Sequence, residues 1–177
     1  HLHTDWSDGL DSVEDMVAEA IRRGCSYVAV SDHTAYHVAA NGLSAEQLLA
    51  QWEAIDRLQR RYPSIVILKG AEVDILPDGT LDISDDILQR ADIVMASVHR
   101  HSDMEPRALT RRLIRAMENP LVNVLAHPTG RSIGQSDYRV DVEELLCTAA
   151  RLGVALEINC APNRLDLDER LARRCDD

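Results

Sequence analysis

Short apolar runs recur along the chain, and each leads into a histidine or a glutamate. The runs are 27–30, 65–68, 93–96 and 121–126, and the polar residues that follow them are His33, Glu72, His99 and His127. Between the runs, apolar residues recur at helical spacing, as in Val13, Met16, Val17, Ala20 and Ile21. Apolar strands that alternate with amphipathic helices predict an α/β fold with a parallel sheet covered by helices.

The same pattern predicts the order of the elements. Helices are expected at about 13–23, 44–61, 84–90, 106–119 and 141–152, and strands at 27–32, 65–75, 93–99, 122–127 and 154–160. End signals support two of these helices. Ser44 and Gln47 form a capping-box pattern, whereas Asp141 can cap the last helix and Gly153 can end it.

The spacing of the strand ends favours a barrel. His33, Glu72, His99, His127 and Glu157 follow one another at intervals of about 30 to 40 residues, close to the ~30 residues of a βαβ unit. In a barrel the carboxyl ends of all strands face one mouth, so side chains from five successive strands can form a single site.

Composition and charge limit the function classes. A chain of 177 residues with 45% hydrophobic residues fits one globular domain. It has no apolar stretch near the ~20 residues of a membrane helix, and its four scattered cysteines fit reduced thiols, so we expect a cytoplasmic protein. The net charge of −11 argues against a nucleic-acid coat, although bound cations would let an acidic site accept a phosphate substrate.

Imidazoles and carboxylates at strand ends are the ordinary ligands of zinc, manganese and iron. His1 and His3 share one face of an extended segment. Glu72 is the sharpest signal, because a carboxylate after an apolar run is costly to bury unless it is paired or metal-bound. Taken singly, His33 and His127 also fit core histidines, and Asp8 fits a turn or helix cap. Together the strand ends predict a metal centre.

These segments, taken in order, resemble the motifs of the PHP domain, a family named for polymerase and histidinol phosphatase. The matching segments are 1–9, 31–33, 70–72, 97–99 and 126–128. Finer motifs at 40–43, 72–79, 127–131 and 157–159 are similar to the C-terminal PHP domain of bacterial family X DNA polymerases. The resemblance covers essentially the whole chain, so we expect residues 1–177 to be a single PHP domain.

The resemblance implies a distorted (βα)7 TIM-like barrel with a trinuclear metal centre. Two to three divalent ions are expected, manganese first, with zinc or iron as alternatives. The implied ligands are His1 and His3 for the first metal, Asp8 and His33 for the second, His99 and His127 for the third, and Glu72 as the bridge.

The sequence departs from the family pattern at its end. The family closes its site with an Asp-x-His motif on the last strand, and this chain has no histidine after His127. The strand that should precede His1 is also missing. We therefore expect a fragment that is incomplete at both ends, with reduced occupancy of the first and second metals.

The implied reaction is hydrolysis of a phosphoester by a metal-bound hydroxide, with Glu72, Asp8 and His99 as catalytic residues. Residues expected to contact the phosphate or substrate are Arg131, Arg100, His101 and Asn159. For the polymerase branch, the implied substrate is the 3′ end of DNA. The implied activity is a 3′-to-5′ exonuclease or 3′-end-processing enzyme in DNA repair, with a polymerase domain upstream of His1.

Three alternatives remain at this stage. A small-molecule phosphatase of the histidinol phosphatase type would use the same metals. A non-catalytic PHP module would only support a polymerase. An amidohydrolase also opens with His-x-His, but it would want a bridging lysine where this chain has Glu72, and Lys69 lies three residues too early.

Overall fold

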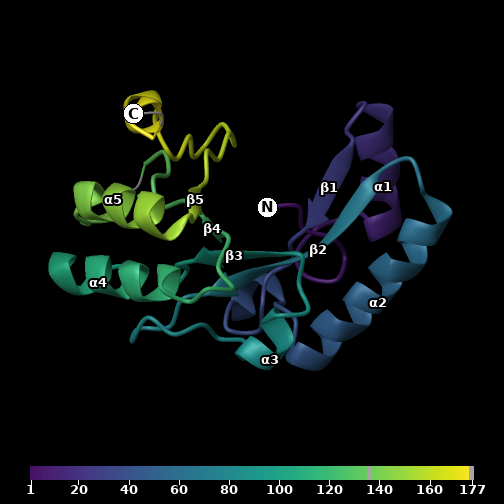
Figure 1. Ribbon diagram of the computed structural model, residues 1–177, viewed down its shortest axis with the longest axis horizontal. Coiled ribbons are helices and arrows are strands. Elements are labelled where there is room, and N and C mark those ends of the chain that lie inside the picture. Colours follow the sequence, from purple (N-terminus) through teal and green to yellow (C-terminus); the bar gives the residue numbers. More distant parts are fainter. Residues whose placement is uncertain (135–136, 176–177) are drawn as a thin grey trace. The chain divides into compact units, whose positions relative to one another are not determined.

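The computed structural model describes residues 1–134 and 137–175 (Figure 1). The helices are α1 (Val13–Arg22), α2 (Ala45–Arg61), α3 (Asp85–Leu88), α4 (Pro106–Met117), α5 (Val142–Leu152) and α6 (Glu169–Arg173), with a 3-10 helix η1 at Val38–Ala40. The strands are β1 (Tyr27–Val30), β2 (Val66–Asp74), β3 (Ile93–Ser97), β4 (Val124–Leu125) and β5 (Ala155–Leu156). The strand order in the sheet is β1-β2-β3-β4-β5.

The predicted α/β class and the predicted order of elements are confirmed. Two short helices, η1 and α6, were not predicted, and β4 and β5 are shorter than the apolar runs that contain them. After β4, Ala126 N still donates to the Ala96 carbonyl at 2.9 Å, whereas His127 N donates to the Glu157 carboxylate at 2.7 Å, so backbone pairing stops at His127. The described strands form a five-stranded sheet, and the seven-stranded barrel stays a prediction.

Among the described residues, no helix combines the length and apolar character needed to cross a bilayer.

The described residues form two compact units. Unit 1 comprises His1–Asp74 and Asp82–Val94, and unit 2 comprises Ile75–Leu81 and the described residues from Met95 onward.

Unit 1 is built on the parallel pair β1 and β2, whose register runs from Tyr27 opposite Val66 to Val30 opposite Lys69. Helix α1 contacts β1, and α2 contacts β2 (Figure 1). Both helices begin with a capping box, at Ser12 and at Ser44. The apolar core of this unit includes Val17, Val30, Leu48, Ile55, Ala71 and Val73.

Trp52 joins α2 to β2 in the core of unit 1. Its indole nitrogen donates a buried 3.0 Å hydrogen bond to the carbonyl of Gly70. A Cβ at Gly70 would lie 2.5 Å from the Val30 carbonyl oxygen, so this position has no room for a side chain. Close approach of the two strands and the indole bond together set the position of the carboxyl end of β2.

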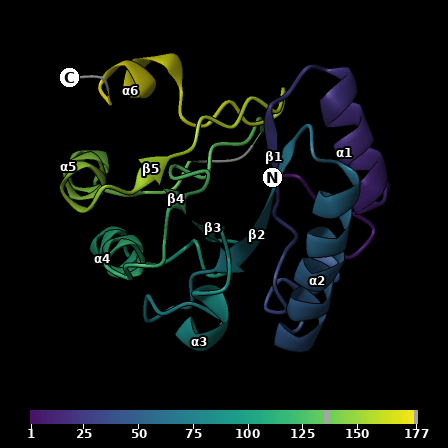
Figure 2. The same cartoon turned by 45° about the vertical axis from the view of Figure 1, so that its right-hand side comes forward.

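Unit 2 contains the parallel ladders β3–β4 and β4–β5, which pair Met95 with Val124 and Leu125 with Leu156. Helices α4 and α5 lie side by side (Figure 2). Asp141 caps α5 by accepting from Glu144 N at 3.1 Å, and Gly153 ends that helix in the left-handed conformation, as the sequence predicted. The buried residues of this unit include Leu109, Leu113, Ala116, Leu125 and Leu145.

Replacing Trp52 with phenylalanine is expected to lower the free energy of unfolding by about 1–3 kcal/mol, because the variant loses a buried hydrogen bond and leaves a carbonyl without its donor. Urea unfolding measures this change. The matched control is Trp6→Phe, which removes the half-buried second tryptophan of the chain. Equal losses in the two variants would contradict the assigned role of the indole bond.

Candidate metal centre

Three imidazoles of unit 1 meet one oxygen of Glu72. This glutamate lies near the carboxyl end of β2 and is fully buried. Its Oε2 is 2.7 Å from His1 Nδ1, 3.3 Å from His3 Nε2 and 3.5 Å from His33 Nδ1. A buried carboxylate needs hydrogen-bond donors or cations around it, and histidine side chains occupy that position here.

Asp8 lies on the other side of two of these imidazoles. Its Oδ1 is 4.0 Å from His3 Nδ1 and 3.9 Å from His33 Nε2. These separations are too long for hydrogen bonds. They suit two ligands of one ion, because donor atoms that each bond a metal at about 2.0–2.1 Å lie roughly 3 to 4 Å apart. His3 Nδ1 is also buried without a hydrogen-bond partner.

Two sets of ligand atoms in unit 1 therefore fit a metal ion: His1, His3 and Glu72, and His3, Asp8 and His33. Both sets contain only residues that the sequence predicted. They share His3, whereas the predicted assignment gave each histidine to one metal. Imidazole nitrogen and carboxylate oxygen are donors that suit manganese, zinc and iron.

Burial lowers the pKa of His3, and the nearby carboxylates of Glu72 and Asp8 only partly offset this effect. Burial disfavours the charged imidazolium. His3 is therefore biased toward the neutral form, which is the form that binds a metal.

The buried carboxylate of Asp32 anchors the segment that carries His1 and His3. It directly follows Ser31 at the end of β1 and accepts four hydrogen bonds. The donors are Thr4 N and Thr4 Oγ1 at 2.6 Å each, and Ser7 Oγ and Gln51 Nε2 at 2.5 Å each. This set joins the segment after His3 to the end of β1 and to helix α2, and Leu2 N holds the other side of His3 by donating to Ser31 Oγ at 3.0 Å.

The backbone also ties His33 to Glu72. Glu72 N donates to Asp32 O at 3.0 Å, and Thr34 N donates to Glu72 O at 3.2 Å. The two site residues are thus neighbours in an extension of the β1–β2 pairing.

Residues 33–43 form a loop whose two ends are joined by a backbone hydrogen bond. Leu43 N donates to His33 O at 2.8 Å, and His37 N donates to Thr34 O at 3.0 Å. Asn41 is left-handed with φ 52°, and a Cβ on Gly42 would lie 1.9 Å from Thr34 O.

Asp82 holds the same loop from a distant part of the sequence. It accepts from Thr34 Oγ1 at 2.9 Å, from Tyr36 N at 3.3 Å and from Asp74 N at 2.9 Å. Burial raises the pKa of Asp82 despite these hydrogen bonds, and the Asp74 carboxylate raises it further.

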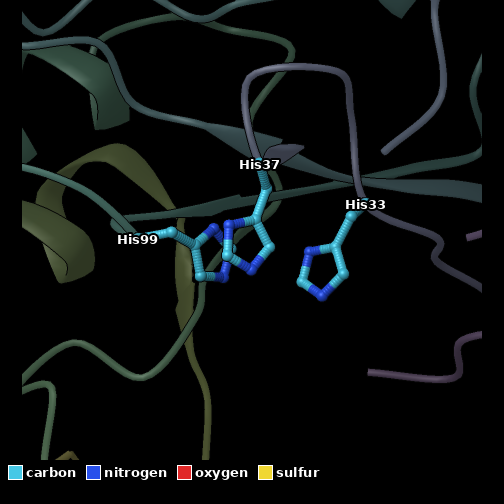
Figure 3. Close-up of side chains that lie close together, drawn as sticks. All are labelled: His33, His37 and His99. Carbon is cyan, nitrogen blue, oxygen red and sulfur yellow. The ribbon is translucent and has the colours of Figure 1, made fainter. Parts of the chain in front are cut away.

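His37 lies in this loop and is the residue that the sequence prediction missed. Its ring centroid is 4.7 Å from that of His33, with the ring planes at 66° (Figure 3). The His-x-x-x-His spacing of the two residues was a signal, but no apolar run precedes His37.

In unit 2, His99 follows β3 and His127 follows β4. Their ring centroids are 5.4 Å apart, and Ser97 Oγ lies 3.3 Å from His99 Nδ1. His127 is 1% exposed. The two predicted third-metal ligands are thus adjacent in this unit, and their assignment to a metal stays a prediction.

The predicted substrate residues of unit 2 have different surroundings. Arg100 and His101 are exposed, and their carbonyls each accept a 3.0 Å bond from the buried Arg112. The Arg131 guanidinium lies 3.8 Å from Asp168. Asn159 Oδ1 accepts from Ala161 N at 3.0 Å, which is a structural bond.

Asp166 supports the loop after His127 and was not predicted. It is fully buried and accepts from Thr129 Oγ1 at 2.8 Å and from Arg131 N at 3.2 Å. Burial raises the pKa of this carboxyl group, and the hydrogen bonds oppose the rise.

Comparison with known families explains this arrangement of residues. A family model described as the PHP domain matches residues 1–161. The chain belongs to the PHP domain family. The family prediction is therefore confirmed.

The PHP domain has named relatives of two kinds. DNA polymerase/3′-5′ exonuclease PolX of Bacillus subtilis is 45% identical over 168 residues, which are 94% of this chain and 30% of that protein. A probable phosphatase of Syntrophotalea carbinolica is 32% identical over 163 residues, which are 90% of this chain and 63% of that protein. The chain therefore spans less than two thirds of either relative. The names agree with the predicted class of hydrolases that act on phosphoester bonds.

A similar fold is found among solved structures. An example is the crystal structure of histidinol phosphate phosphatase from Lactococcus lactis, complexed with zinc, L-histidinol and phosphate. The TM-score is 0.58 at 19% identity, and the match covers 90% of this chain and 71% of that chain.

The Asp32 hydrogen bonds generate a stability prediction. In the wild type, donors of Thr4, Ser7 and Gln51 face the carboxylate oxygens of Asp32. Asp32→Asn replaces one of these oxygens with an NH2 group, which cannot accept a hydrogen bond. We expect the free energy of unfolding to fall by roughly 2–4 kcal/mol and the Thr4 amide to exchange faster. Urea unfolding and hydrogen exchange measure the two effects. The control is the exposed Asp5→Asn, and an Asp32 variant as stable as this control would rule out the anchor.

The raised pKa of Asp82 generates a pH prediction. The folded state holds this proton more tightly than the unfolded state, so the stabilisation is complete below the unfolded pKa of about 4 and is lost as pH rises through the folded pKa. The stability advantage of the wild type over Asp82→Asn should therefore shrink from pH 4 to pH 7. Unfolding at several pH values tests this, with the exposed Asp86→Asn as control. A stability advantage that grows with pH would show that folding lowers the pKa of Asp82, and it would contradict the prediction.

Proposed function

We propose that this PHP domain is a metal-dependent phosphoesterase that processes the 3′ ends of DNA as part of a family X DNA polymerase. The observation that carries the proposal is the contact of three imidazoles with one oxygen of the buried Glu72, at 2.7, 3.3 and 3.5 Å. Such a donor set suits divalent cations, and the family's named relatives include an exonuclease and a probable phosphatase.

The proposed roles are those that the family resemblance implies, and the ligand sets of unit 1 support part of them. His1 and His3 would hold one ion and Asp8 and His33 a second, with Glu72 as the bridging carboxylate. His99 and His127 would hold a third. When bound, divalent ions supply positive charge for the phosphate oxygens and lower the pKa of a water molecule. Asp32 keeps His1 and His3 in place, and the neutral form of His3 leaves its nitrogens available as ligands.

We place the substrate contacts of unit 2 on the side chains of Arg100, His101 and Arg131. These side chains lie near the two histidines in sequence, and a guanidinium matches phosphate geometry. Asn159 is the weakest of the predicted contacts, because its side-chain oxygen already accepts from Ala161 N.

The DNA-processing reading is favoured by the comparison with the Bacillus polymerase, at 45% identity against 32% for the Syntrophotalea phosphatase. It implies a covalently linked polymerase domain as partner. The second candidate is a phosphatase for small phosphomonoesters, which the phosphatase names and the shared fold with a histidinol phosphate phosphatase favour. The third is a structural module without catalysis.

Glu72→Gln is expected to reduce manganese-dependent hydrolysis roughly 100-fold or more, because removing even a supporting partner of a metal ligand costs 10–100-fold. Bound manganese, measured by elemental analysis, should fall in parallel. The matched control is Glu53→Gln, which makes the same chemical change on the exposed side of α2. If the Glu72 variant does not fold, Asp8→Asn tests the same centre.

The choice of substrate separates the three candidate functions. Release of nucleotides from a recessed 3′ end, lost in the variant, supports the DNA-processing role. Preference for histidinol phosphate moves the protein to the small-molecule branch. Binding of manganese without turnover of either substrate leaves the structural module.

A further inference from the structure

His37 stands apart from the other imidazoles of unit 1. His1, His3 and His33 each have a nitrogen within 3.5 Å of Glu72 Oε2. His37 instead meets the edge of the His33 ring, at a centroid distance of 4.7 Å. It is half-buried.

The 33–43 loop fixes where His37 lies. The His37 amide donates to Thr34 O at 3.0 Å, and its carbonyl accepts from Ala40 N at 3.1 Å. Gly42 is required because a Cβ there would lie 1.9 Å from Thr34 O. A loop that uses a left-handed Asn41 and an obligatory glycine holds its side chains in place before any ligand arrives.

A phosphate group near His37 would need a hydrogen-bond donor from the protein. The centre in unit 1 contains the carboxylates of Asp8 and Glu72, and a phosphate group that approaches it needs hydrogen-bond donors. Three basic side chains elsewhere in this unit form ion pairs: Arg22 with Glu19, Arg61 with Glu14, and Lys69 with Asp56. An imidazole N–H beside the ligand His33 supplies a donor at the centre itself.

We propose that His37 is a substrate-binding residue that donates an N–H to a non-bridging oxygen of the substrate phosphate. The proposal rests on the proposed function for the identity of the substrate group. It assigns His37 to the phosphate and leaves the metals to the residues around Glu72. Val38, which is 73% exposed, lies next to His37 and extends the accessible surface of the loop.

Two variants separate the donor role from a packing role. His37→Phe keeps a ring against His33 but removes both nitrogens, whereas His37→Gln keeps an N–H donor and removes the ring. Val38→Ala is the control for a change elsewhere in the loop. The readouts are the affinity of the manganese-loaded protein for inorganic phosphate, the manganese content, and KM and kcat for the phosphoester substrate.

We expect His37→Phe to weaken phosphate binding about tenfold and to raise KM similarly, as the loss of one charge-assisted hydrogen bond predicts. Manganese content should stay at the wild-type value, and His37→Gln should retain most of the phosphate affinity. Phosphate binding unchanged in His37→Phe, or weakened only in His37→Gln, overturns the proposal. A fall in manganese content in His37→Phe makes His37 a metal ligand and overturns it as well.

The phosphate measurement keeps this proposal separate from the proposed function. A wild-type protein that binds phosphate through His37 but hydrolyses no phosphoester would refute the enzymatic role and support the binding role. Hydrolysis by His37→Phe with an unchanged KM would support the enzymatic role and refute the binding role of His37.

Discussion

The candidate site depends on a carboxylate that we do not assign to a metal. Asp32 is fully buried and accepts four hydrogen bonds, from Thr4, Ser7 and Gln51. These bonds hold the chain just after His3, and Leu2 is held on the other side by its backbone bonds to Ser31. The position of the imidazoles around Glu72 therefore depends on a negative charge kept out of water by its donors.

Glu72 and Asp32 illustrate two ways to bury a carboxylate. Asp32 is satisfied by neutral donors of the protein and can persist without an ion. Glu72 faces three imidazoles at one oxygen, an arrangement that would become more favourable when a cation lies between them. Asp32 therefore has a structural role, whereas Glu72 has a role in the proposed chemistry.

Periodicity and caps predicted most of the fold, because Ser44, Asp141 and Gly153 act locally. His33 was predicted beside Glu72 because strand ends of a parallel sheet converge, whereas the roles of His1, His3 and Asp8 came from the family resemblance. The position of His37 was not, since it depends on Asp82, 45 residues away in sequence, which holds Thr34 and Tyr36. The burial of Arg112 was equally hidden, because an arginine on an amphipathic helix normally faces solvent and this one bonds the backbone carbonyls of Leu76, Arg100 and His101.

The strand order gives the sheet a simple assembly route. Because the order in space is the order in sequence, β1-β2-β3-β4-β5, each strand finds its partner in the segment made just before it. Each pairing still has to close a βαβ crossover, for example between Tyr27 and Val66, and parallel pairs of this kind form more slowly than local hairpins. Glu72 lies within the second strand, so His1, His3 and His33 are synthesised before the carboxylate that they surround. A nascent chain of the first two strands already contains every residue of the unit 1 ligand sets.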